Sequence, residues 1–295
     1  MKKIETAFSH IDLAKKSTKK LNDVWKLSSS NDEIISSKPK VVDSYQELVE
    51  SIAQIAFYNQ DYSLFFRGQS QDFIDEKGKT TIYPSIYRPD KNGKQVTRKF
   101  EELDESIKKL VKSFQRSPNK FAGTTNVIKY KELSWALAQH YEIIDTPVLD
   151  LTHSVHVASS FALKNLKSGE YGVVNVLGMP NITNTISYFT NEELAIIRLI
   201  AFGPPKASRI FMQEAYAVSP FPFTDLVRKV DKEKFNFSRR LLAKFSIPKT
   251  EKFWGKDFSS LPNHLLLPEI DKFREFLAPH LIDLDAFYDY FSTKK

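Results

Sequence analysis

Amphipathic helical segments and short apolar runs follow one another along this chain without a regular alternation. The clearest helical segment spans 97–117, where apolar residues recur at spacings of three and four: Phe100, Leu103, Ile107, Leu110 and Phe114. The run YGVVNVLG at 171–178 is largely apolar and indicates a buried strand. A doubly wound parallel sheet needs strands and helices in strict alternation. We therefore predict an α+β fold with a mixed or antiparallel central sheet, surrounding helices and a helical N-terminal extension.

Further elements follow from the same periodicities and from helix-opening hydroxyl residues. We expect helices at 6–27, 43–57, 129–141, 152–163 and 191–200. We expect strands in the apolar runs at 62–66, 146–151 and 240–248, and one or two strands at 207–221 around a polar interruption at Gln213 and Glu214. The polar stretch 28–40 is typical of a linker.

These elements suggest three parts of the chain. Residues 1–42 are predicted to form an N-terminal helical extension and linker. Residues 43–275 are predicted to form the main α+β domain, and residues 276–295 a C-terminal helix packed on that domain.

Composition excludes several classes of chemistry. The chain of 295 residues has no cysteine, so disulfides, thiolate nucleophiles and cysteine-based zinc sites are absent. Its six histidines include no H-E-x-x-H motif, and no metal site is expected. The apolar stretches are short and interrupted, so we expect no membrane span. The first residues lack the apolar block of a secretory signal, and a cytoplasmic location is expected.

The absence of glycine-containing motifs and the net charge limit the classes of chemistry and ligand expected for this chain. The chain has no G-x-G-x-x-G, no G-K-[ST] and no G-x-S-x-G motif, which argues against Rossmann, P-loop and α/β-hydrolase chemistry. The net charge is +7. A positive chain either carries a solubilising surface or binds an anion such as a nucleotide or a nucleic acid, and both readings stay open.

Three segments place polar groups at the ends of apolar runs, at 65–69, 137–163 and 208–221. In the first, Phe65 and Phe66 lead directly into Arg67 and Gly68. We expect the two rings to anchor a strand in the core and Gly68 to let the backbone turn away. Arg67 is then held stiffly at the mouth of a cleft.

The chain resembles the FRG-domain family of bacterial proteins over roughly residues 60–275. The motifs that carry the resemblance occur in the family's order and are Phe66-Arg67-Gly68-Gln69, YPSIYR at 83–88, Gln139-His140-Tyr141, LDLT at 149–152, Phe161-Ala162, Arg209 with Gln213, and LPEID at 267–271. The chain departs from the family pattern between helix and strand. Glu142 stands where the family has glycine, Asp145-Thr146-Pro147 replaces its PTR, and Leu151 replaces its tryptophan.

The resemblance implies a domain of the kind that accompanies bacterial stress or anti-phage systems. The order of residues is also similar to that of ADP-ribosyltransferases, which implies NAD as a substrate. In that reading Arg67 binds the pyrophosphate as a planar fork, and Thr152 or Ser154 positions the nicotinamide ribose. Glu214 orients the ribose 2′-hydroxyl and stabilises a cationic centre, with Gln213 beside it as the residue that matches the family.

Further residues are predicted to bind the ligand: Phe66, Gln69, Tyr83, Arg88, Gln139, His140, Tyr141, Asp150 and Arg209. Each candidate also has a purely structural alternative. Arg67 and Asp150 can form a buried ion pair, and His140 can be a core histidine. Thr152 can cap the following helix, and Gln213 with Glu214 can mark a bulge.

The sequence is consistent with three functions. The leading hypothesis is an NAD- or nucleotide-binding, ADP-ribosyltransferase-like effector that takes a small anionic ligand. The first alternative is a nucleic-acid-binding module, whose affinity falls steeply with salt. The second is a non-catalytic protein-interaction module. No membrane partner is expected for any of them.

Overall fold

A computed structural model describes residues 1–16, 21–24, 26–90, 93–116, 124–203, 207–226, 232–268 and 271–277. Its centre is an eight-stranded sheet in the order β3-β10-β6-β4-β5-β9-β8-β7. Only β3 and β10 are parallel, and the other neighbours are antiparallel, so the sheet is mixed. The strands are β3 (Lys40–Val41), β4 (Ser63–Gln69), β5 (Leu149–Thr152), β6 (Tyr171–Met179), β7 (Ile186–Phe189), β8 (Leu194–Arg198), β9 (Ala215–Pro220) and β10 (Leu241–Pro248).

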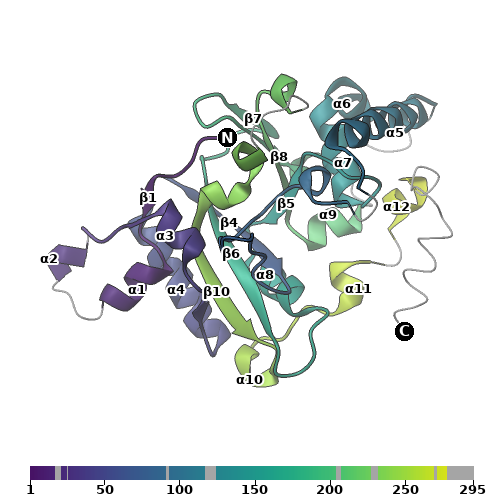
Figure 1. Ribbon diagram of the computed structural model, residues 1–295. Helices are drawn as coiled ribbons and strands as arrows, with labels where there is room; N and C mark the ends of the chain where they lie inside the picture. The colour runs from purple at the N-terminus through teal and green to yellow at the C-terminus, as the bar shows by residue number, and fades with distance from the viewer. Residues whose placement is uncertain are drawn as a thin grey trace.

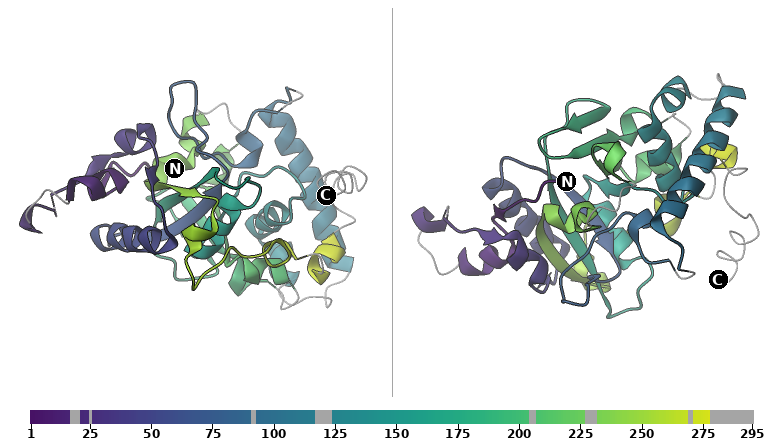
Figure 2. Two further views of the ribbon diagram at one scale, coloured as in Figure 1. Left: turned by 90° about the horizontal axis from the view of Figure 1, so that it is seen from below. Right: turned by 45° about the horizontal axis from the view of Figure 1, so that its top comes forward.

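Helices surround this sheet and confirm the predicted α+β class. They are α1 (His10–Lys16), α2 (Leu21–Val24), α3 (Asn31–Ser36), α4 (Tyr45–Tyr58), α5 (Val96–Arg116), α6 (Thr124–Lys129), α7 (Lys131–His140), α8 (Val155–Leu163), α9 (Ser208–Met212), α10 (Glu251–Trp254), α11 (Asn263–Leu266) and α12 (Lys272–Leu277). Helices α1, α3 and α4 gather beside β10, whereas α5, α6 and α7 lie across the molecule from them (Figures 1 and 2). No helix in the described part of the chain has the length and apolarity to cross a bilayer.

The helices bury their apolar faces in two separate clusters of side chains. Leu48, Ile52 and Ile55 of α4 join β4, β6 and β10 in the first cluster. The second cluster forms between α5, α7 and the strands β8 and β9. In α5 the residues with the predicted helical spacing are all buried, as is Lys99: Phe100, Leu103, Ile107, Leu110 and Phe114.

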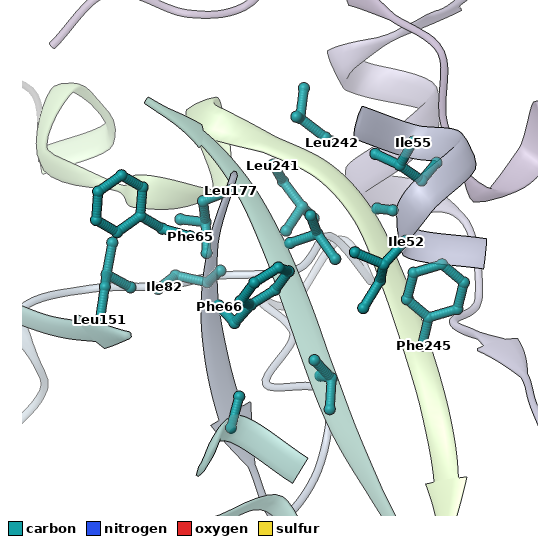
Figure 3. Packing of buried hydrophobic residues seen from close by; sticks show 14 of the residues in the cluster. Ile52, Ile55, Phe65, Phe66, Ile82, Leu151, Leu177, Leu241, Leu242 and Phe245 are labelled. Carbon is teal, nitrogen blue, oxygen red and sulfur yellow. The ribbon is translucent and has the colours of Figure 1, made fainter. Parts of the chain in front are cut away.

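The two phenylalanines of β4 lie in the first cluster, 0% and 5% exposed for Phe65 and Phe66. Figure 3 shows their rings on opposite sides of the strand, as successive strand residues require. The prediction that they anchor a strand is confirmed.

Gly68 does not end that strand, and the predicted turn is wrong. β4 continues to Gln69 and pairs with β6 along its whole length. Gly68 is needed for space, because a Cβ there would overlap the main-chain oxygen of Ala158 in α8. Gly172 in β6 meets the same helix, where a Cβ would lie 2.5 Å from the main-chain oxygen of Ala162. The two glycines therefore let α8 pack directly on the backbone of β4 and β6.

Most other predicted elements are confirmed, and four differ from the prediction. The helix expected at 191–200 is strand β8, because Leu194, Ala195, Ile196 and Ile197 are all buried between β7 and β9. A short apolar run buried on both faces carries no period that separates a strand from a helix. The strand expected at 207–221 begins as helix α9 and becomes strand β9 only at Ala215.

The linker expected at 28–40 contains helix α3. Ser30 opens it with a capping box: its Oγ accepts from the N–H of Glu33, and Glu33 Oε2 accepts from the N–H of Ser30. The S-x-x-E pattern is visible in the sequence and indicates this helix start.

Several of the described residues within 1–42 pack against the sheet. Met1, Ile4 and Phe8 are buried in the first cluster, and β1 (Thr6–Ala7) pairs with β2 (Ser29–Ser30). The helix expected at 6–27 is wrong at its start, where β1 forms, and the described residues beyond it form α1 and α2; residues 17–20 and 25 lie outside the described residues. The proposed three-part division of the chain stays a prediction, and residues 278–295 of its C-terminal helix lie outside the described residues.

We predict that Gly68→Ala destabilises the fold by about 3 kcal/mol, the upper end of the cost of overpacking, because main-chain atoms of α8 cannot move aside cheaply. Urea denaturation measures the free energy of unfolding. Gly178→Ala is the matched control in β6, because its Cβ would meet only side-chain carbons of Leu242 and Ile4. Equal losses of unfolding free energy in the two variants would contradict the conclusion that contact with the α8 main chain causes the destabilisation.

His10 links the N-terminal helices to the sheet and makes stability sensitive to pH. Its Nδ1 accepts from the N–H of Lys244 in β10 at 3.3 Å, and its Nε2 donates to the main-chain oxygen of Lys38 at 3.2 Å. Burial, together with the charge of Lys244, lowers the pKa of His10 to about 4. The folded protein therefore holds this histidine neutral.

We predict that the free energy of unfolding falls by about 3 kcal/mol through His10 as pH drops from 6.5 towards 4. In that window the unfolded chain binds a proton that the folded chain does not, which favours unfolding. Denaturation of the wild type and His10→Gln at pH 7 and pH 4.5 measures the effect. The variant should lose this part of the pH dependence, and identical profiles would refute the assignment.

Candidate functional site

The candidate site lies where two central strands part. β4 and β5 share a single register pair, Phe66 with Thr152, although β4 stays paired with β6 throughout. Beyond that pair a pocket of about 490 Å³ is lined by residues of both strands and of α7, α8 and α9. This volume is in the range typical of small-molecule sites, roughly 300–1,000 Å³.

Arg67 spans the opening between the strands. Its Nη1 donates to the main-chain oxygen of Asp150 at 2.8 Å, and its buried Nε has no partner among the described residues. The described residues show no ion pair between the two side chains, so the buried pair considered for them does not form. Burial and the charge of Arg88 lower the pKa of Arg67 to about 10, which leaves the guanidinium charged at neutral pH.

Asp150 uses its side chain to hold His140. His140 is 1% exposed at the end of α7, and its Nδ1 lies 3.3 Å from Asp150 Oδ1. Burial alone would raise the pKa of Asp150, but the hydrogen bond and charge of His140, with the charges of Arg67 and Arg209, hold it below its usual value. Nε2 of His140 is buried and has no partner among the described residues.

Two further arginines reach the pocket. Arg88 follows the 3₁₀ turn η1 (Ser85–Tyr87), and its Nε donates to the main-chain oxygen of Tyr83 at 2.9 Å. Arg209 of α9 donates from Nη2 to Glu142 Oε1 at 2.7 Å, and its Nε is buried without a partner in the described chain. The Arg209 guanidinium also lies over the Tyr141 ring, 5.8 Å from the centroid.

Polar residues complete the walls. The Gln139 side-chain oxygen accepts from the hydroxyls of Thr146 at 2.7 Å and Ser85 at 3.2 Å, which fixes the amide plane. Thr152 Oγ1 accepts from the N–H of Ser154 at 3.0 Å. Gln213 is 7% exposed and donates from Nε2 to the main-chain oxygen of Leu266 at 2.6 Å.

The structure brings most of the predicted site residues together. The pocket is lined by Phe66, Arg67, Arg88, Gln139, His140, Asp150, Thr152, Arg209 and Gln213. Their roles in binding or catalysis stay predictions.

Five predicted site residues do not line the pocket. Ser154 caps α8, accepting from the N–H of Val157, and Gln69 accepts from the side chain of Asn175. Tyr83 donates to Glu233 at 2.8 Å. Tyr141 is 1% exposed and donates to Asp271 at 3.1 Å, so its ring is not free to stack on a base. Glu214 is exposed, with its backbone in the left-handed region at φ 44°.

Several pocket residues were not predicted: Ser85, Glu142, Ile144, Asp145, Val157, Ala158 and Phe161. Ser85 and Phe161 stand inside the quoted motifs, so the signal for them was present. Glu142 and Asp145 mark the departures from the family pattern. Val157 and Ala158 carry no polar group, and only the placement of α8 brings them to the site.

No group of three or more His, Asp and Glu side chains in the described part of the chain is arranged to hold a metal ion.

Comparison with known families identifies one domain. Residues 62–170 match the model of the FRG domain, a range that includes β4, α7, β5 and α8 and hence Arg67, His140 and Asp150. Arg209 and Gln213 lie beyond the match. No curated protein and no solved structure matches the chain. The chain therefore contains a segment, residues 62–170, that matches the FRG domain.

Proposed function

We propose that the pocket binds a small phosphate-bearing nucleotide, with NAD as the candidate ligand. The observation that carries the proposal is the state of Arg67. It is a half-buried cation with no carboxylate partner in the described chain, and its buried Nε donor is unused. A buried donor without a partner costs about 1–3 kcal/mol, and an anionic ligand removes that cost.

The surrounding residues support the same ligand class. Arg67, Arg88 and Arg209 come from three separate parts of the chain and meet at one pocket. Guanidinium groups bind phosphate oxygens through paired hydrogen bonds. Phe66 and Phe161 provide apolar surface for a base or a nicotinamide ring.

We propose that the pocket binds NAD; transfer of ADP-ribose to an acceptor is a separate and more specific hypothesis. The carboxylate predicted for that transfer, Glu214, lies outside the pocket lining. The resemblance to the family suggests a setting in bacterial stress or anti-phage defence, and a nucleotide pocket suits an effector of that kind.

We predict that Arg67→Ala weakens NAD binding by about ten- to hundredfold, because it removes about 1.5–3 kcal/mol of charged hydrogen bonding. Isothermal titration calorimetry measures the affinity. Arg88→Ala should weaken binding as well, and it removes a more exposed side chain that the fold depends on less.

Arg98→Ala is the matched control. Arg98 lies on the surface of α5, pairs with Glu101 and does not line the pocket. Thermal unfolding of each variant separates lost binding from lost structure. The proposal fails if wild type gives no binding heat, or if Arg67→Ala binds NAD as well as wild type does.

The nucleic-acid alternative predicts a different competition result. We expect ADP-ribose to displace bound NAD, because it carries the same pyrophosphate. A single-stranded oligonucleotide should not displace it, because the described pocket has room for one small molecule. Fluorescence competition at two salt concentrations tests this. Displacement by the oligonucleotide, weakening steeply as salt rises, would favour the nucleic-acid module.

A further inference from the structure

Each carboxylate that lines the pocket in the described chain already has a partner. Asp145 Oδ2 accepts from Lys99 Nζ at 3.0 Å, and Glu142 pairs with Arg209 at 2.7 Å. Asp150 holds His140. The described lining therefore has no unpaired carboxylate that could stabilise a developing positive charge on a substrate.

His140 remains as the group able to accept a proton. The ionised Asp150 carboxylate accepts a hydrogen bond from Nδ1, and we assign the ring proton to Nδ1 on that basis. Nε2 then carries a lone pair. This atom is buried and unpartnered in the described chain, on a side chain that lines the pocket. A histidine held by a carboxylate with its second nitrogen free is suited to act as a general base.

Asp150 joins this base to the proposed anion site. Its side chain holds His140, and its main-chain oxygen accepts from Arg67 Nη1 at 2.8 Å. A phosphate bound by Arg67 is therefore close to Asp150, the residue that orients His140. A single residue of β5 thus contacts both the arginine proposed to bind the phosphate and the histidine proposed to act as the base.

We propose that this pocket hydrolyses NAD at its nicotinamide glycosidic bond, with His140 as the general base; the proposal rests on the proposed nucleotide binding. A water oxygen forms a bond to C1′ of the nicotinamide ribose as the bond from C1′ to the pyridinium nitrogen breaks. The electron pair of the broken bond neutralises that nitrogen. The water proton goes to His140 Nε2 and then to solvent, and the products are ADP-ribose and nicotinamide.

The leaving group explains the choice of substrate. Nicotinamide departs as a neutral molecule and needs no proton from the protein. A pocket whose described lining holds His140 as the base, with its carboxylates already paired, meets that requirement. Attack by activated water also does not require Glu214, the carboxylate predicted to stabilise the cationic centre.

The test compares nicotinamide release with NAD binding in the same variants of the full chain. His140→Gln should lower nicotinamide release by about 10²- to 10⁴-fold, the usual contribution of a general base, and should retain NAD binding by calorimetry. His264→Gln is the matched control, an exposed histidine on α11 that does not line the pocket, and should leave the rate unchanged.

A second variant keeps the test decisive if His140→Gln does not fold. Asp150→Asn preserves the side-chain oxygen that accepts from Nδ1 and removes only the charge, so it should fold, bind NAD and release nicotinamide more slowly. Thermal unfolding confirms which variants are folded.

The outcomes separate the two proposals. Binding of NAD by wild type without nicotinamide release overturns the hydrolysis and leaves the proposed function in place. Release that survives in His140→Gln but is lost in Glu214→Gln overturns the role of His140 and returns the chemistry to a carboxylate. Absence of NAD binding by wild type refutes the proposed function and the hydrolysis together.

Discussion

The structure of the site depends on the parting of β4 and β5 in the middle of the sheet. The two strands touch at Phe66 and Thr152 and then separate, and the Arg67 guanidinium reaches across to the main chain of Asp150. A continuous ladder would fill this space with backbone hydrogen bonds. The Arg67 side chain bridges β4 and β5 where the backbone hydrogen bonds between them are missing. The two strands therefore stay neighbours in the sheet, and room for a ligand remains between them.

Helix α8 closes the other side of that gap, and glycines decide how near it comes. Gly68 and Gly172 let the helix backbone meet the strand backbone without an intervening side chain. Val157, Ala158 and Phe161 of α8 consequently stand beside Arg67 as pocket wall. The glycine after Arg67 thus serves packing, and through packing it shapes the pocket.

Parts of the fold and site were predictable because they rest on local chemistry. The apolar spacing in α5 and the ring pair of β4 report burial directly. Ser154 capping α8 follows from a hydroxyl that meets free N–H groups. Residues 194–197 were misread because a run buried on both faces carries no period. Tyr141 was misplaced for a different reason: its partner, Asp271, is distant in sequence.

The residues with chemical capacity can be identified from the amino-acid order alone: a cation after two aromatic rings, a histidine at the end of an amphipathic helix, and an aspartate in a short strand. Their types and local elements depend on near neighbours in the chain, which a sequence displays. The folded chain was needed to show that His140 faces Asp150, that Arg67 contacts a main-chain oxygen instead of a carboxylate, and that Glu214 lies outside the pocket. Those outcomes depend on where strands part and how closely a helix packs, which contacts between distant segments determine.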